Sequence, residues 1–236
     1  MEPTPQPRVK ICCISSVAEG RLAIRYGAAA LGLVSEMPSG PGVIPERLIR
    51  EIAATVPPGV ASFLLTSRQS AAAIIDQQRR LRTNTIQICD HLTDGTYQHI
   101  REALPGVSLV QVIHVTGEGS IAEATEVAPF ADGILLDSGN RVAAVKELGG
   151  TGRRHDWQIS RRIRESVRVP VYLAGGLRPE NVAEAIEIVQ PFGLDVCNGV
   201  RTDGRLDDRK LAAFLQAVRA TVQQHLAADA RPAARR

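Results

Sequence analysis

Short aliphatic runs recur along the chain, and each is followed by a turn and then by a stretch with helical spacing. Buried runs of this length, alternating with helices, are typical of parallel strands covered by helices. Eight runs fit this description: VKICCI (Val9 to Ile14), AALGLV (Ala29 to Val34), GVASFLL (Gly59 to Leu65), TIQI (Thr85 to Ile88), SLVQVI (Ser108 to Ile113), GILL (Gly133 to Leu136), VPVYLA (Val169 to Ala174) and LDV (Leu194 to Val196).

The stretches between the runs carry apolar residues at helical spacing. In PERLIREIAATV (Pro45 to Val56) the apolar residues share one face, PENVAEAIEIV (Pro179 to Val189) opens with Pro and Glu as a first helical turn, and DDRKLAAFLQAVRATV (Asp207 to Val222) is the last helix. Eight strand-then-helix units without a break in composition predict a single (β/α)8 TIM barrel rather than a doubly wound open sheet. We expect the barrel to span residues 9–225, between a flexible N-terminal extension (1–8) and a basic disordered tail (226–236).

Composition agrees with an aliphatic α/β core, because 44% of the 236 residues are hydrophobic and only 3% are aromatic. The net charge of +3 comes largely from ARPAARR (Ala230 to Arg236), a solvated tail without the stacking aromatics of a nucleic-acid site. The start MEPTPQPRVK lacks an apolar signal segment, and no run is long enough to span a membrane. These features predict a cytoplasmic protein that binds neither nucleic acid nor membrane.

Three glycine-bearing loops follow the last three strands, where active-site groups of barrels gather. These loops are GGTG (Gly149 to Gly152), AGGLRPEN (Ala174 to Asn181) and CNGVRTDG (Cys197 to Gly204). Each alone is compatible with a plain turn, but three neighbouring loops predict a phosphate site built from backbone amides, with Arg153 or Arg154 adding charge.

Strand one and the ends of strands six and eight supply the candidate chemistry. Lys10 and Cys12 lie two residues apart and so share a face, while Cys13 is expected to point into the helix layer. An ammonium near a thiol favours the thiolate, so Cys12 is either a base or nucleophile, or inert core. Asp137 is either a general acid or a loop cap, and Asp195 is either a second functional carboxylate or the partner of Lys10.

Five blocks in order, KICCI, LLDS, GGTGRRHDW, AGGLRPENVAEAI and DVCNGV, resemble those of phosphoribosylanthranilate isomerase of tryptophan biosynthesis, from about Val9 to Phe214. The resemblance implies a (β/α)8 barrel that rearranges an N-aryl phosphoribosylamine to the 1-deoxyribulose phosphate without cofactor or metal. The oligomeric state stays open between a monomer and a homodimer. The resemblance also implies Cys12 as the general base and Asp137 as the general acid. The implied phosphate site comprises Gly150, Thr151, Gly152, Gly175, Gly176, Asn198 and Gly199, with Lys10, Asp195 and Arg153 in support.

The chain also departs from the family pattern. The arginine usually found after the cysteine is absent from CISS (Cys13 to Ser16), and SEMPSGPGVIP (Ser35 to Pro45) lacks the arginine that helps to hold anthranilate. Cys89 and Asp90 replace His and Gly, and Arg201 replaces a glutamate. The alternatives are therefore a diverged enzyme acting on another phosphorylated sugar or aminosugar, and a non-catalytic binder of a phosphate ligand. A soft-metal site formed by Cys12, Cys89 and Cys197 matches no ligand spacing, so we expect no metal.

Overall fold

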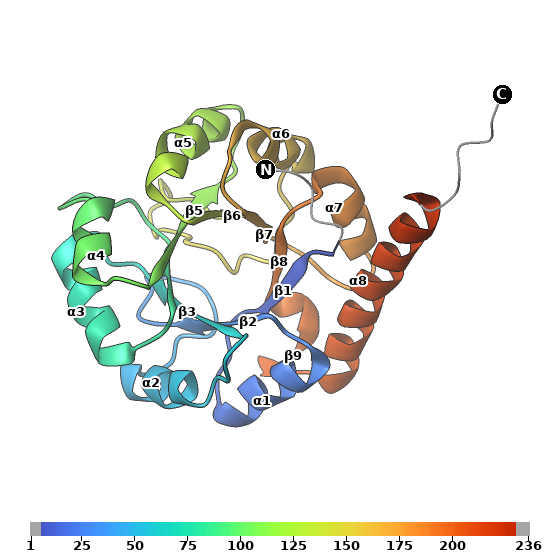
Figure 1. Cartoon of the computed structure of the whole chain (residues 1–236), viewed down its shortest axis with the longest axis horizontal. Coiled ribbons are helices and arrows are strands. Elements are labelled where there is room, and N and C mark those ends of the chain that lie inside the picture. The colour runs from blue at the N-terminus through green and yellow to red at the C-terminus, as the bar shows by residue number, and fades with distance from the viewer. Residues whose placement is uncertain (1–5, 230–236) are drawn as a thin grey trace.

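Eight parallel strands close into a barrel in sequential order, with helices on the outside (Figure 1). The computed structural model describes residues 6–229. The barrel strands are β1 (Arg8–Ile11), β2 (Ala30–Val34), β3 (Ala61–Thr66), β4 (Thr85–Ile88), β5 (Ser108–His114), β6 (Gly133–Asp137), β7 (Val171–Leu173) and β8 (Gly193–Val196). The pairing of β1 with β8 closes the ring, with Ile11 opposite Val196. The predicted (β/α)8 TIM barrel is confirmed.

One helix follows each strand and covers the sheet. The helices are α1 (Val17–Tyr26), α2 (Glu46–Ala54), α3 (Ala71–Leu81), α4 (Tyr97–Ala103), α5 (Gly119–Val127), α6 (Trp157–Ser166), α7 (Val182–Val189) and α8 (Asp208–Asp229), with two 3-10 turns, η1 (Ala128–Phe130) and η2 (Asn198–Val200). A small hairpin, β9 (Arg201–Thr202) and β10 (Arg205–Leu206), precedes α8. None of the helices within residues 6–229 is both long and apolar enough to cross a membrane.

Alternation along the strands separates two apolar layers. Ile11, Leu31 and Leu64 belong to the large cluster shared with the helices, which includes the fully buried Trp157. The neighbouring positions, among them Cys12 and Phe63, form a second cluster, which we assign to the barrel interior because successive side chains of a strand point to opposite faces of the sheet. The second cluster is where functional side chains of β1 can meet those of other strands.

Several expected boundaries were wrong. Strand β1 ends at Ile11 rather than at Ile14. Helix α7 begins at Val182, not at Pro179, because the side chain of Asn181 accepts the amide of Arg178 and donates to Gly176 O, each over 2.9 Å, which holds a turn ahead of the helix.

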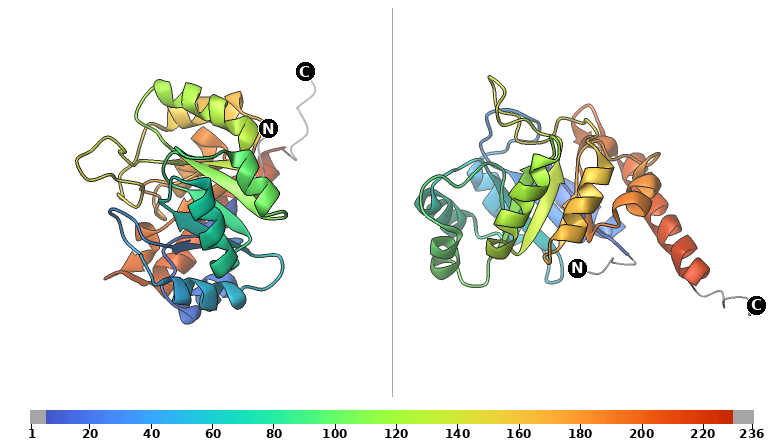
Figure 2. Two further views of the ribbon diagram at one scale, coloured as in Figure 1. Left: turned by 90° about the vertical axis from the view of Figure 1, so that its left-hand side faces the viewer. Right: turned by 90° about the horizontal axis from the view of Figure 1, so that it is seen from above.

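The expected limits of the barrel domain also differ from the observed ones. Arg8 already belongs to β1, and α8 continues to Asp229, past the tail boundary expected at 226. In Figure 2, the C-terminal part of α8 extends beyond the body of the barrel. The rest of the expected extension (1–5) and of the expected tail (230–236) lies outside the described residues.

Candidate active site

A cavity of about 270 Å³ opens at the carboxyl ends of the strands. Segments from most of the barrel line it, including the loops after β2, β6, β7 and β8. Its lining residues include Cys12, Cys13, Gln87, Cys89, Asp137, Gly150, Gly152, Gly175, Gly176, Arg178, Asp195, Cys197, Asn198 and Gly199. The structure thus brings the sequence-predicted thiol, carboxylates and most of the glycine loop residues to one cavity.

A buried ion pair lies beneath the cavity. Lys10 Nζ is 2.8 Å from Asp195 Oδ2 and 3.5 Å from Cys12 Sγ, and Lys10 is fully buried. Burial by itself would lower the pKa of Lys10, but the carboxylate of Asp195 raises it, so the ammonium stays charged. The shared face of Lys10 and Cys12 is confirmed, and of the two roles considered for Asp195 the structure shows the contact with Lys10.

The thiol of Cys12 lies in an environment that favours the thiolate. The side-chain hydrogen bond from Cys13 is the largest cause that lowers the pKa of Cys12, and the ammonium of Lys10 acts in the same direction. Burial and the charge of Asp195 oppose them without cancelling them. A thiol that ionises more readily than usual inside a cavity can serve as a general base or a nucleophile.

Cys13 does not point into the helix layer, and that prediction was wrong. Because β1 ends at Ile11, the alternation of a strand no longer applies, and Cys13 takes a left-handed conformation with φ of 61°. Its Sγ lies 2.7 Å from Cys197 Sγ and 3.7 Å from Pro41 O. Sequence reasoning therefore missed Cys13 and Cys197 as neighbours at the cavity wall.

Asp137 ends β6 and faces the same cavity. Burial raises the pKa of its carboxyl, although the amides of Ser138 and Gly150 act in the opposite direction. The amide of Ser138 donates to Asp137 Oδ1 over 2.7 Å. At Gly149 an added Cβ would overlap Asp137 Oδ2, so only glycine lets this loop approach the carboxylate so closely. A buried carboxyl that keeps its proton longer than usual can act as a general acid.

The three glycine loops pack against one another at the rim. Asn198 Nδ2 donates to Gly150 O over 3.3 Å, joining the loops after β6 and β8. A Cβ at Gly199 would overlap the carbonyl oxygen of Leu177, so this position needs glycine to let the loops after β7 and β8 meet. Thr151 shares a hydrogen bond of 2.7 Å with Ser138, next to Asp137.

The arginines of the GGTGRRHDW segment turn away from the cavity. Arg153 forms an ion pair with Glu147, and Arg154 pairs with Glu184 at 2.9 Å while its guanidinium stacks 3.5 Å from the ring centre of Trp157. Among residues 6–229, the arginine that lines the cavity is Arg178, in the loop after β7, and its Nε lies 3.5 Å from Glu180 Oε2. It stood in the quoted AGGLRPEN block, but nothing in the sequence distinguished it from a surface arginine.

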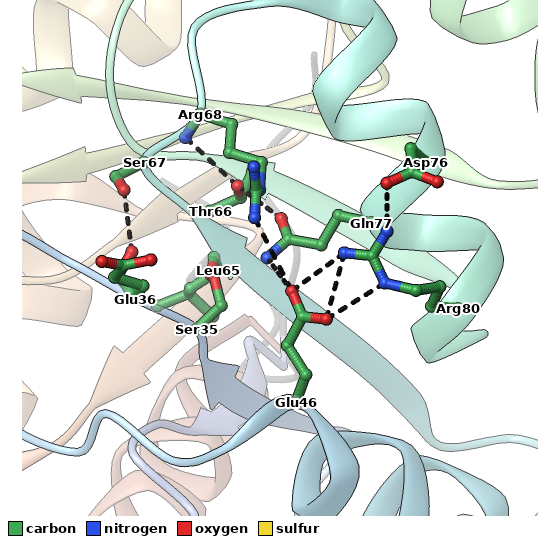
Figure 3. Close-up of polar contacts among 10 residues, drawn as sticks. All are labelled: Ser35, Glu36, Glu46, Leu65, Thr66, Ser67, Arg68, Asp76, Gln77 and Arg80. Carbon is green, nitrogen blue, oxygen red and sulfur yellow. Dashed lines mark hydrogen bonds and ion pairs between the residues drawn. The ribbon is translucent and has the colours of Figure 1, made fainter.

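The loop after β2 covers one side of the cavity with Met37, Ser39, Gly40 and Pro41. Figure 3 shows how its start is fixed to β3 and to the residue after it: Ser35 Oγ donates to Leu65 O over 2.6 Å, and Ser67 Oγ, directly after β3, donates to Glu36 O over 2.7 Å. Ser39 Oγ donates to Lys146 O over 2.6 Å, which ties this loop to the one after β6. The two loops protrude together from one end of the barrel in Figure 2.

A network of charged side chains supports the base of this loop. Glu46, at the start of α2, accepts hydrogen bonds from Arg80 at 3.1 Å and from Gln77 at 3.0 Å, and lies 3.8 Å from Arg68 (Figure 3). Gln77 in turn accepts from Thr66 Oγ1 at 2.8 Å. The guanidinium of Arg68 is therefore engaged with Glu46.

Two departures from the family pattern are explained by contacts outside the cavity. Arg201 donates to both oxygens of Glu19, each over 3.2 Å, and to the carbonyl oxygens of Cys12 and Cys13 at 3.1 and 2.6 Å. Asp90 accepts Lys146 Nζ at 2.6 Å. Within residues 6–229, no group of three or more His, Cys, Asp or Glu side chains is arranged to hold a metal ion.

A closed parallel barrel with a thiol, a buried carboxyl and glycine loops around one cavity has the architecture of a (β/α)8 barrel enzyme. The model of the N-(5'phosphoribosyl)anthranilate (PRA) isomerase family matches residues 9–217. The chain belongs to this family.

Relatives and solved structures agree with the family model. An N-(5'-phosphoribosyl)anthranilate isomerase of Methanocella arvoryzae is 38% identical over 215 residues, which cover 91% of this chain and 99% of that protein. The crystal structure of phosphoribosyl anthranilate isomerase from Thermotoga maritima has 27% identity and a TM-score of 0.75, covering 91% and 99% of the two chains. A complex of such an enzyme with reduced 1-(o-carboxyphenylamino)-1-deoxyribulose 5-phosphate has 26% identity and a TM-score of 0.73, with the same coverage.

Proposed function

We propose that this chain is an isomerase of tryptophan biosynthesis that converts N-(5-phosphoribosyl)anthranilate to 1-(2-carboxyphenylamino)-1-deoxyribulose 5-phosphate. One observation carries the proposal beyond family membership. The thiol of Cys12, which directly follows β1, and the carboxyl of Asp137, which ends the non-adjacent strand β6, line the same cavity, and their pKa values are shifted in the directions that a base and an acid require.

The reaction needs two proton transfers, for which these groups are suited. Asp137 donates its proton to the furanose ring oxygen as the C1–O bond breaks, leaving a protonated Schiff base between C1 and the anthranilate nitrogen. The Cys12 thiolate then removes the proton from C2, which the Schiff base has acidified, and gives an enol-amine. The enol-amine tautomerises to the 2-ketone of the product, so no redox cofactor or metal takes part.

The phosphate would lie on the glycine loops after β6, β7 and β8. Backbone amides in such loops bind an anion without a dedicated cation, and barrels commonly use the loops after strands seven and eight in this way. We assign phosphate binding to Gly150, Gly152, Gly175, Gly176, Asn198 and Gly199, with Thr151 orienting Ser138. Arg178 also lines this rim, and its guanidinium is within ion-pair distance of Glu180.

The aglycone would occupy the part of the cavity under the loop after β2. Val34, Leu65 and Leu148 provide apolar walls for an aryl ring. Because Met37, Ser39, Gly40 and Pro41 carry no charge, the loop offers neutral groups to the anthranilate carboxylate. The four free cysteines support a reducing, cytoplasmic location, where we propose that the enzyme works as a monomer or homodimer.

The test is turnover of phosphoribosylanthranilate by the purified protein, followed through the change in anthranilate fluorescence. The parent chain is expected to turn over, and Cys12→Ala is expected to lose about 100-fold or more of the rate because the base is gone. Loss of the base should leave binding of a phosphorylated product analogue in place. The absence of turnover in the parent, or an unchanged rate in Cys12→Ala, would overturn the proposal.

A further inference from the structure

Two thiols outside the proposed acid and base pair lie within reach of a covalent bond. Cys13 follows β1 and Cys197 follows β8, the two strands whose pairing closes the barrel. Their sulfurs are 2.7 Å apart, whereas bonded sulfurs lie about 2.05 Å apart, so an approach of roughly 0.7 Å would form a disulfide. Both cysteines are free.

The surroundings of Cys13 hold its side chain toward Cys197. Its left-handed backbone turns the thiol back from the line of β1, and Gly42 packs so closely that a Cβ there would overlap Cys13. Arg201 fixes the backbone on the other side through its 2.6 Å hydrogen bond to Cys13 O. The pair is thus oriented by contacts from two loops rather than by chance rotation of two mobile side chains.

The pair is reachable from solvent through the cavity. Cys197 is partly exposed, Cys13 is buried, and both line the cavity wall next to Cys12. A small oxidant that enters the cavity therefore meets Cys197 first, with Cys13 directly behind it. An accessible thiol with a second thiol in contact is the arrangement found in reversibly oxidised cysteine pairs.

We propose that Cys13 and Cys197 are a site of reversible oxidation. A peroxide converts the two thiols to a disulfide within the cavity wall, and the disulfide suppresses turnover. The effect on turnover rests on the proposed isomerase function, whereas disulfide formation does not.

The step balances with hydrogen peroxide as the two-electron oxidant. The Cys197 thiolate attacks one peroxide oxygen, the O–O bond breaks, and a sulfenic acid and hydroxide result, the hydroxide becoming water with the proton that the Cys197 thiol released on ionising. The sulfur of Cys13 then attacks the Cys197 sulfur and displaces its hydroxyl group, which leaves as water with the Cys13 proton. Two thiols and one peroxide thereby give one disulfide and two waters, and a dithiol reductant reverses the change by exchange.

Oxidation would act on Cys12 through Cys13. Cys13 is the neighbour that most lowers the pKa of the Cys12 thiol, an effect that depends on the proton of the Cys13 thiol, and a disulfide sulfur has no such proton. The base would lose the partner that most favours its thiolate. At the same time Cys197, whose thiol donates to Asn198 Oδ1 at the rim, would be drawn toward β1. Both changes lower the rate without removing any proposed catalytic group.

The first experiment maps the bond in the full-length protein. The chain is treated with hydrogen peroxide, remaining thiols are blocked with N-ethylmaleimide, and peptides are analysed by mass spectrometry with and without dithiothreitol. The expected product is a Cys13–Cys197 crosslink, with Cys12 and Cys89 still alkylated. Cys197→Ser should give no crosslink, and Cys89→Ala, which removes another cavity cysteine, should form it as the parent does.

The second experiment measures turnover of phosphoribosylanthranilate before oxidation, after it, and after dithiothreitol. We expect a loss of at least about tenfold that dithiothreitol restores in the parent and in Cys89→Ala, since the base is weakened. A crosslink between Cys12 and Cys13, or four alkylated thiols after peroxide, would overturn the site. A crosslinked protein with undiminished turnover would overturn the control of activity, and a parent without turnover would instead count against the isomerase function.

Discussion

Arg201 holds Glu19 through two hydrogen bonds of 3.2 Å each, and the same guanidinium binds the carbonyl oxygens of Cys12 and Cys13. Both side chains of the pair are largely buried, with exposed fractions of 5% and 13%. The amide of Leu206 also donates to Glu19, at 2.8 Å. This ion pair therefore joins α1, the turn after β1 and the hairpin before α8.

Replacing Arg201 is expected to destabilise the protein strongly. Arg201→Met leaves the Glu19 carboxylate buried without its cation, a change that costs on the order of 3 kcal/mol. The free energy of unfolding, measured in urea, should fall by that amount. Arg161→Met, which breaks an exposed pair with Glu165 within α6, is the matched control and should cost less than about 1 kcal/mol. Equal losses in the two variants would show that burial of the Arg201 pair contributes nothing.

Asp137→Asn is expected to remove the general acid while keeping the shape of the side chain. Turnover of phosphoribosylanthranilate should fall by about 100- to 10,000-fold, because an amide cannot supply the proton for ring opening. The control is Asp132→Asn: the carboxylate of Asp132, directly before β6, accepts the amide of Leu109 and pairs with Arg101. Comparable rates for Asp137→Asn and Asp132→Asn would rule out the acid role.

Gly199→Ala tests the contact between the loops after β7 and β8. The added methyl group would overlap Leu177 O, so the loops must separate. We expect a loss of about 1–3 kcal/mol in stability, together with weaker binding of inorganic phosphate, measured by calorimetry. Gly119→Ala introduces the same methyl group at a position of α5 with no atom within 4 Å, and it should leave phosphate binding unchanged. Parental phosphate affinity in Gly199→Ala would argue against a phosphate site at this rim.

His155 gives the stability of the fold a specific pH dependence. Its Nε2 lies 2.7 Å from Ser160 Oγ, and burial lowers the pKa of His155 from its usual 6.5 to about 4. Below about pH 6.5 the unfolded chain takes up a proton that the folded chain does not, so stability falls until the pH reaches about 4.

The variant His155→Gln should lack this contribution. Between about pH 7.5 and about pH 5, the unfolding free energy of the parent is expected to fall by roughly 2 kcal/mol more than that of His155→Gln. Proton NMR of the folded parent should place the titration midpoint of His155 near 4. A midpoint near 6.5 would contradict the prediction.

The strand order and the meeting of Lys10, Cys12 and Asp137 could be predicted, because the aliphatic runs and the polar residues at their ends can be recognised from the local pattern of the sequence. The orientation of Cys13 could not, since it depends on β1 ending at Ile11 and on a left-handed backbone that only tertiary contacts fix. The pairing of Arg201 with Glu19 spans 182 positions, so no local pattern reveals it. The sequence contains one indication of this pairing. Compared with the family pattern, the arginine after the cysteine is absent and an arginine stands at position 201.

Lys10 and Asp195 form a buried pair but lie 185 positions apart, so the ribosome makes one long before the other. The ammonium leaves the ribosome early, and its carboxylate partner follows only when almost the whole chain has been made. Until β8 docks beside β1, Lys10 has to remain hydrated, because an unpaired charge inside the barrel would be costly. The barrel can thus close, and the cavity can acquire its floor, only at the end of translation, so nascent chains that stop short of β8 carry no working site.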